Sequence, residues 1–357
     1  MSPMDTGSSQ TAHALVNDLT GEFHMANGQI LDGYGGSWIV WKTTDIYAWW
    51  HAFEATCQTP LGRKLMNACA DQEEFLLRRS GFLLGGRFLK KRRQSGIIDA
   101  RWKRYGWGGI DSKHQTANSL LFAPIVAGFA LATKEQINAQ RYKLEWRQTG
   151  QRLIQFDWTQ DASTLPPAPE VPSLPWGSSP KLGLEQVDVF SDFTWANEGW
   201  SISGESVCLL PMDAFSRLFH TCRAYQHSLT TEQVDAWSTP DITSGSRTVF
   251  LMISASMSHL VNGSEQPIYI ENIASWASLA NHYLKPFGWG APISIESLGT
   301  DHGVRFGLED SPVLPFLTGW LVAMWERGHG RTSKFKLTKS SDTWVLEVDS
   351  RLNYIED

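Results

Sequence analysis

The spacing of apolar residues changes from strand-like to helix-like in the same order at two places along the chain. Residues 36–41 have the pattern of a buried strand, and apolar residues at helical spacing follow up to Phe53. Residues 204–210 repeat the strand pattern, and apolar residues at helical spacing follow up to Phe219. We therefore expect a strand and then a helix at both places.

An aspartate stands at the start of each of these two helical patterns. Asp45 and Asp213 each lie nine residues after the glycine that opens the preceding strand. A carboxylate at that position can accept hydrogen bonds from the free N–H groups of the first helical turn. The sequence therefore predicts both residues as N-caps.

Further helical patterns follow, and each series closes with alternating residues. The helical patterns cover 63–93 and 97–105 in the first series and 231–260 and 273–287 in the second.

The closing segments, 142–158 and 335–348, alternate apolar and polar residues, which predicts antiparallel hairpins with one buried face. The fold class is therefore α+β. We expect two related domains in tandem, each an antiparallel sheet with helices packed on it, forming an internal pseudo-dimer.

Two short motifs indicate that the second series duplicates the first. An aromatic-Gly-Trp-Gly motif occurs at 105–108 and 287–290, and Pro and Gly stand four residues apart in both 123–128 and 314–319. Glycines on both sides of a Trp suit a helix exit, where one glycine adopts the left-handed cap. A duplication implies that a site is either doubled or placed at the junction.

Proline marks the junction between the two series. Six prolines fall within 161–185, which excludes a helix and favours an extended linker. We call 28–160 the first repeat and 186–357 the second repeat. Residues 1–27 are expected to form a flexible leader.

Composition narrows the class of protein. A hydrophobic content of 42%, with no apolar run near the ~18 residues of a membrane span, indicates a soluble globular chain. The polar start lacks a signal-peptide pattern, and the four cysteines show no metal-ligand spacing, so we expect a cytoplasmic location. Cys57 and Cys222 fall within apolar helical patterns and are expected in the core. The 17 tryptophans imply either large packing surfaces or stacking pockets.

The order of these elements resembles that of the 4-vinyl-reductase-type domain. In that pattern a helix ends in Gly-Trp-Gly, strands surround an Asn-Ser pair, an apolar helix with a small-residue Gly follows, and a hairpin closes the domain. Asn118-Ser119 and Asp310-Ser311 stand where the pair is expected, and the likeness covers roughly 36–158 and 204–348. The resemblance implies a fold shared with TRAPP subunits and a relation to bacterial sensors of phenols or to bacteriochlorophyll synthesis.

The chain departs from the family at its zinc site. Many members carry Cys, Gly and Cys four residues apart in the closing hairpin. Here the corresponding positions are Trp146, Gly150 and Ile154 in the first repeat and Thr338, Asp342 and Leu346 in the second. Zinc requires about four nitrogen, sulfur or oxygen ligands, so we expect no structural zinc and no other cofactor.

The resemblance also suggests ligand contacts. The candidates are His51, Trp107, Asn118, His220 and Trp289. The histidines could donate to a phenol-like or tetrapyrrole ligand, or lie at a helix rim. The two tryptophans could contact a ligand, or plug a helix end.

One basic cluster stands out in a chain of net charge −6. Besides Arg78 and Arg79, it comprises Arg87, Lys90, Lys91, Arg92, Arg93, Arg101, Lys103 and Arg104. Such a cluster can attract nucleic acid or another anionic partner, with Trp102, Tyr105 and Trp107 available for stacking, or form a solvated helix face.

No nucleophile–base pair, metal constellation or phosphate-binding loop stands out in the sequence. We therefore expect a non-catalytic binding, regulatory or adaptor protein that takes a protein partner, a hydrophobic small molecule, or both. An enzyme or accessory factor of aromatic or tetrapyrrole metabolism is the alternative. Nucleic-acid binding through residues 78–104 is a second alternative.

Overall fold

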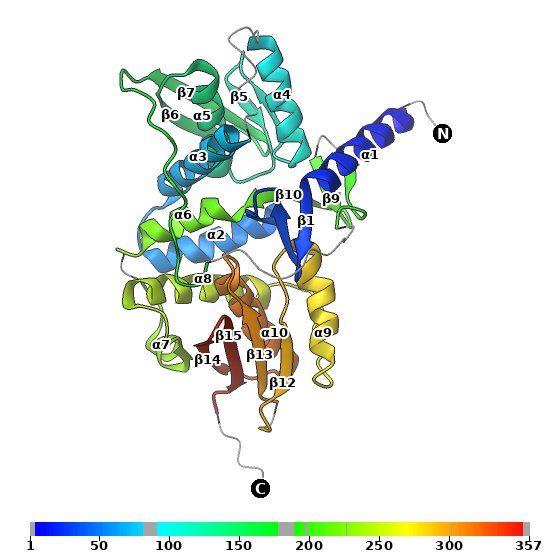
Figure 1. The fold of residues 1–357 in the computed structure, drawn as a ribbon, viewed down its shortest axis with the longest axis vertical. Coiled ribbons are helices and arrows are strands. Elements are labelled where there is room, and N and C mark those ends of the chain that lie inside the picture. The colour runs from blue at the N-terminus through cyan, green and yellow to red at the C-terminus, as the bar shows by residue number, and fades with distance from the viewer. Residues whose placement is uncertain are drawn as a thin grey trace.

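The fold is α+β, with helices packed on antiparallel sheets (Figure 1). This computed structural model describes residues 4–80, 91–177, 189–196, 199–225, 227–300 and 302–352. Side chains are described from residue 12 onward and not for 91–93.

The first repeat and the segment before it supply five helices and seven strands of the described chain. They are α1 (Met4–Glu22), β1 (Phe23–Ala26), β2 (Gln29–Asp32), β3 (Ser37–Lys42), α2 (Thr43–Cys57), α3 (Gly62–Arg79), α4 (Lys91–Arg104), β4 (Gly109–Asp111), β5 (Thr116–Asn118), α5 (Ala123–Asn138), β6 (Tyr142–Gln148) and β7 (Leu153–Gln160).

The second repeat follows the same plan. Its elements are β8 (Thr194–Ala196), β9 (Gly199–Ile202), β10 (Glu205–Pro211), α6 (Met212–Cys222), α7 (Thr231–Ala236), β11 (Trp237–Ser238), α8 (Ser244–Asn262), α9 (Ser275–Leu279), the π turn η1 (Ala280–Leu284), the 3-10 turn η2 (Lys285–Phe287), β12 (Ser294–Ser297), β13 (Val304–Glu309), α10 (Leu314–His329), β14 (Ser333–Ser340) and β15 (Thr343–Ser350).

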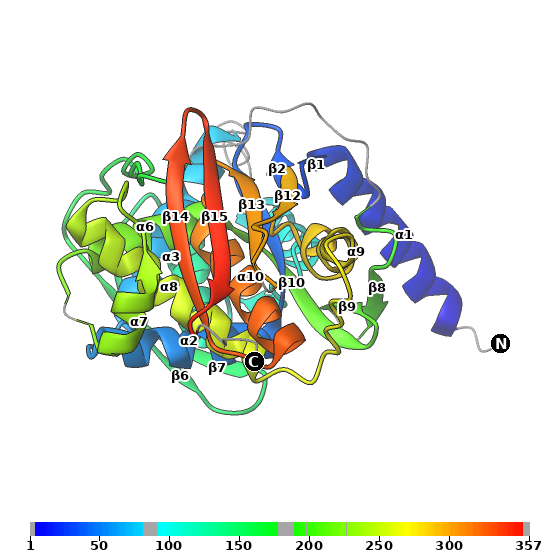
Figure 2. The ribbon, with the colours of Figure 1, turned by 90° about the horizontal axis from the view of Figure 1, so that it is seen from below.

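The strands form three sheets. The central sheet has the order β1-β2-β3-β10-β9-β8 and takes strands from both repeats. A sheet β4-β5-β7-β6 belongs to the first repeat, and a sheet β11-β14-β15-β13-β12 belongs to the second. Figure 1 shows these two outer sheets at opposite ends of the molecule, and Figure 2 shows β14, β15 and β13 lying over α10. The central sheet joins the repeats.

The pairing of β3 with β10 is symmetric about its own midpoint. Val40 pairs with Leu209, and Trp41 pairs with Cys208. When Gly36 is aligned with Gly204, position 40 corresponds to 208 and position 41 to 209. Exchanging the two repeats therefore turns the Val40–Leu209 pair into the Cys208–Trp41 pair. An antiparallel ladder with this property is what an internal twofold relation produces.

The first helix of each repeat packs on the middle helix of the other. Helix α2 lies against α8, and α6 lies against α3. The Gly-Trp-Gly motifs cross over too, since Gly106 lies against the Val207 carbonyl and Gly288 against the Trp38 carbonyl. Both glycines have positive φ, and a Cβ would lie 2.9 Å and 2.8 Å from those oxygens, so only glycine fits without strain. The repeats are therefore interlocked.

The Gly of each Pro-Gly motif allows two helices to cross closely. A Cβ on Gly128 of α5 would lie 2.4 Å from the Met66 carbonyl oxygen of α3. A Cβ on Gly319 of α10 would lie 2.4 Å from the Ser254 carbonyl oxygen of α8. The same packing device thus occurs once in each repeat.

Instead of the flexible leader expected for 1–27, the structure has α1 and β1. Leu19 is buried, and Phe23 to Ala26 pair with β2 at the edge of the central sheet. The apolar contacts that order this segment come from residues far along the chain, and local pattern did not reveal them.

The two expected N-caps are also corrected. The helices begin at Thr43 and Met212, with Lys42 and Pro211 as N-caps that make no side-chain capping bond. Asp45 and Asp213 lie within the first helical turn, where a carboxylate still interacts favourably with the free N–H groups.

The proline-rich segment carries no helix or named strand over 161–177, in keeping with its composition, and 178–185 lie outside the described residues. It is anchored to the surface. Trp176 is buried and packs edge-on against Phe250 at 5.3 Å between ring centroids, and Arg223 donates to the Ser173 carbonyl oxygen at 3.3 Å.

Candidate functional site

The structure does not bring the five candidate ligand residues together. Trp107 and Trp289 are buried in the core. The Trp107 Nε1 donates to the Leu209 carbonyl oxygen at 2.7 Å, and its ring stacks on Phe129 at 3.9 Å. Trp289 packs edge-on against Trp41. Both tryptophans therefore close helix ends and leave no face for a ligand.

The remaining three candidates are exposed. His51 and His220 lie on the outer faces of α2 and α6, and Asn118 ends β5. The residue after Asn118 is the buried one: Ser119 Oγ accepts a hydrogen bond from the Leu121 N–H at 3.0 Å. Ser311 Oγ does the same for the Val313 N–H at 3.2 Å. The serine of each pair thus has a structural role in both repeats.

Three residues of the basic cluster, Arg101, Lys103 and Arg104, are each paired with a carboxylate of the described chain. Arg101 is 6% exposed and binds both carboxylate oxygens of Glu73 at 2.8 Å. Arg104 reaches Asp18 at 2.9 Å, and Lys103 reaches Asp99 at 2.9 Å. Trp102, Tyr105 and Trp107 are buried, so none can stack on a base. Arg87 and Lys90 lie outside the described residues, as do the side chains of Lys91, Arg92 and Arg93.

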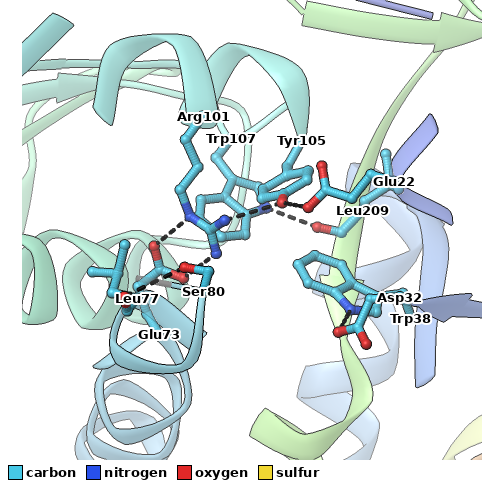
Figure 3. A network of polar contacts seen from close by, with 10 residues as sticks. All are labelled: Glu22, Asp32, Trp38, Glu73, Leu77, Ser80, Arg101, Tyr105, Trp107 and Leu209. Atoms are coloured by element: carbon cyan, nitrogen blue, oxygen red, sulfur yellow. Dashed lines mark hydrogen bonds and ion pairs between the residues drawn. The ribbon is translucent and has the colours of Figure 1, made fainter. Parts of the chain in front are cut away.

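Figure 3 shows the network that Arg101 organises. Its guanidinium also donates to the Tyr105 hydroxyl at 3.0 Å, and that hydroxyl contacts Glu22 of α1. Burial is the largest single influence and disfavours the charge, but Glu73, Tyr105 and Glu22 together outweigh it and raise the pKa of Arg101. The network fixes α1, α3 and α4 relative to one another.

A cavity of about 240 Å³ lies in the first repeat, between α4, α5 and the sheet β4-β5-β7-β6. Its apolar lining is Ile110, Ala130, Ile137, Phe156 and Trp158. Its polar lining is Ser95, Asp111, Ser112, Gln115, Thr133, Lys134 and Asn138. An apolar hollow with a few converging polar groups is the usual form of a small-molecule site.

Two adjacent residues of α5 give the cavity its chemistry. Thr133 is 4% exposed, and its hydroxyl has no hydrogen-bond partner among the described residues. The Lys134 Nζ lies 4.2 Å from the Trp158 ring centroid and 5.1 Å from that of Tyr142. No acidic side chain of the described chain forms an ion pair with Lys134, and burial lowers the pKa of this lysine.

Among the described residues that line the cavity, the one acidic side chain, Asp111, is already engaged. Its carboxylate accepts from the N–H groups of Lys113 at 2.9 Å and His114 at 3.1 Å, and it contacts the His114 ring. The hydrogen bond from His114 is the main cause that lowers the pKa of Asp111. Asp111 is therefore ionised and bound within its own turn.

The corresponding space in the second repeat is filled. Helices α5 and α10 each have 16 residues, with Pro second and Gly sixth. In this alignment Ala130, Thr133 and Lys134 correspond to Leu321, Met324 and Trp325. Leu321, Met324 and Trp325 are all buried, and the Trp325 Nε1 donates to the His302 carbonyl oxygen at 2.8 Å.

The sequence reasoning missed the cavity residues Thr133 and Lys134. The signal was present, because aligning the two Pro-Gly helices shows small or polar residues in one and bulky apolar residues in the other. The shared Pro-Gly motif shows only that the two helices are similar and gives no information on this difference.

Two hairpin residues of the first repeat, Trp146 and Ile154, stand at the positions discussed above for zinc ligands, and both are engaged in packing. Ile154 is buried, and the Arg63 guanidinium lies 5.1 Å from the Trp146 ring centroid. Within the part of the chain that the structure describes, no group of three His, Cys, Asp or Glu side chains is placed to hold a metal ion. All four cysteines are buried, as expected for Cys57 and Cys222.

Comparison with known proteins gives no match to a family model, to a curated protein or to a solved structure. None of the described helices has both the length and the apolar character that a membrane crossing requires.

Proposed function

We propose that this chain is a non-catalytic, ligand-binding regulatory or adaptor protein, in which the first repeat holds a small hydrophobic molecule. The observation that carries the proposal is a contrast between equivalent helices. In the first repeat a cavity lies beside Thr133 and Lys134 of α5, whereas in the second repeat the corresponding residues of α10, Met324 and Trp325, are buried in the core. A cavity kept in one repeat and closed in the other fits a division into a binding half and a supporting half.

A chain of contacts supports an output through the shared sheet. Phe129 of α5 stacks on Trp107, and Trp107 donates to Leu209 of β10. A ligand that shifts α5 would therefore act on the strand that joins the repeats. The resemblance to ligand-sensing domains points to the same kind of function, and a partner protein would receive the signal.

The nucleic-acid alternative receives less support. Arg101 and Arg104 of the basic cluster are committed to Glu73, Asp18 and Glu22, and the aromatic residues beside them are buried. An enzyme of aromatic metabolism would have to act through Asp111 or Lys134, the charged groups of the cavity.

The proposal is tested by filling the cavity with the residues of the second repeat. We expect the full-length double variant Ala130→Leu, Lys134→Trp to lose binding of 2-naphthamide, measured by isothermal titration calorimetry, while its melting temperature stays close to that of the wild type. The exposed Lys143→Trp serves as control and should bind as the wild type does.

Two results would overturn the proposal. One is a filled variant that binds the probe as tightly as the wild type. The other is a wild-type protein that binds neither 2-naphthamide nor 2-naphthoate and retains no small molecule in native mass spectrometry. Conversion of the probe would indicate the enzyme alternative and also contradict a non-catalytic role.

A further inference from the structure

The cavity has a positive charge that forms no ion pair within the described protein. The Lys134 ammonium faces the rings of Trp158 and Tyr142 and has no ion-pair partner among the described residues. Aromatic faces attract a cation, but they replace lost hydration only in part. A partly buried ammonium in this position is therefore poised to accept an anionic group.

A second donor stands beside this cation. Thr133 precedes Lys134 in α5, lines the same cavity, and is 4% exposed with an unpartnered hydroxyl. A buried hydroxyl without a partner is unfavourable and is satisfied by an acceptor. An ammonium and a hydroxyl together are the donors that a carboxylate requires, because each of its oxygens accepts.

The rest of the cavity limits the body of the ligand. Ile110, Ile137 and Phe156 form its apolar walls. A volume of about 240 Å³ falls below the roughly 300–1,000 Å³ typical of drug-sized ligands, so one or two rings fit. The ionised Asp111 repels a second negative charge at its side of the cavity.

We propose that the cavity takes a small aromatic or alicyclic monocarboxylate, with the carboxylate on Lys134 and Thr133 and the ring against Ile110, Ile137 and Phe156. This assignment rests on the proposed function and adds the chemical class of the ligand. The second repeat could not bind a carboxylate in this way, since Trp325 stands at the position of Lys134 and has an indole in place of the ammonium.

The test compares a carboxylate with its neutral isostere. In full-length protein we expect 2-naphthoate to bind at least about tenfold more tightly than 2-naphthamide at neutral pH, since hydrogen bonds to a charged group are the stronger ones. Lys134→Met, close in length and uncharged, should lose this preference and bind the two probes with equal affinity. Lys143→Met, which removes an exposed lysine on the neighbouring strand, should keep the preference for the acid.

The outcomes separate the ligand class from the binding function. Equal or tighter binding of the amide by the wild type, or a preference for the acid that survives in Lys134→Met, would contradict a carboxylate ligand and leave the cavity as a binding site. A melting temperature measured for each variant shows that the comparison is made on folded protein. If neither probe binds the wild type, this inference is wrong, and the proposed function is wrong as well if native mass spectrometry finds no retained small molecule.

Discussion

Helices α5 and α10 hold the same place in two repeats, yet one borders a cavity and the other completes a core. Both helices end in a left-handed residue, Ala139 or Gly330, whose N–H donates to a glutamate carbonyl oxygen. That glutamate, Glu135 or Glu326, also binds the N–H of the first residue in the following strand. The two helices thus end in the same way, while their side chains border a cavity in one repeat and fill the core in the other.

The largest effect on the free energy of unfolding is expected when the lysine of the first repeat is placed at the corresponding position of the second. Trp325→Lys removes a fully buried indole and leaves an unpaired ammonium in its place. We expect a loss of about 5 kcal/mol or more in the free energy of unfolding, measured with urea. The reverse exchange, Lys134→Trp, should change this free energy by only about 1 kcal/mol. Equal costs for the two exchanges would show that the repeats do not differ in packing.

The buried ion pair gives a second contrast between the repeats. Arg101 lies four residues before Tyr105, whereas the residue four before Phe287 in the second repeat is Tyr283, which carries no such charge. Glu73→Gln leaves the Arg101 charge buried without its partner, so we expect a loss of about 3–4 kcal/mol in unfolding free energy.

The exposed pair of Arg305 and Glu347, 2.8 Å apart, provides the matched control for the ion pair. Glu347→Gln should cost less than about 1 kcal/mol. A Glu73→Gln variant no less stable than this control would mean that the network does not fix the helices of the first repeat.

The two aspartates near the helix starts offer the smallest and most pH-dependent contrast. Burial, together with Asp32 and against Arg217, raises the pKa of Asp213 to about 6, from 3.8 for an unperturbed aspartate. Folding therefore favours the protonated carboxyl, and this stabilisation is complete below about pH 4 and lost as pH rises through about 6.

Asp213→Asn should accordingly raise stability at pH 7 by about 1–2 kcal/mol and change it little at pH 4. Asp45 is the counterpart in the first repeat, where burial raises the pKa without so large a shift. Asp45→Asn should give a smaller gain. The comparison requires melting temperatures across pH 4–8, and a pH-independent effect of Asp213→Asn would disprove the assignment.

Local pattern was enough to predict much of the architecture. The α+β class, both closing hairpins, the strand–helix pairs and the glycine-capped helix exits followed from residues close together in sequence. Such features depend on backbone preferences and on which face of an element is apolar, and the sequence contains both.

The surroundings of the candidate site residues could not be predicted in the same way. Arg101 reads as a surface charge until Glu73 is placed opposite it, and Trp107 reads as a ligand contact until Leu209 of the other repeat accepts its N–H. These partners lie 28 and 102 residues away along the chain. Local spacing gives no information on such contacts.

The sequence by itself determined the order of the elements and the duplicated motifs, because these reflect local geometry. Only the tertiary structure decided that the repeats interlock through β3 and β10, that Arg101 is paired with Glu73, and that a cavity remains beside Lys134. The physical reason is that burial, charge pairing and empty volume depend on which distant side chains meet.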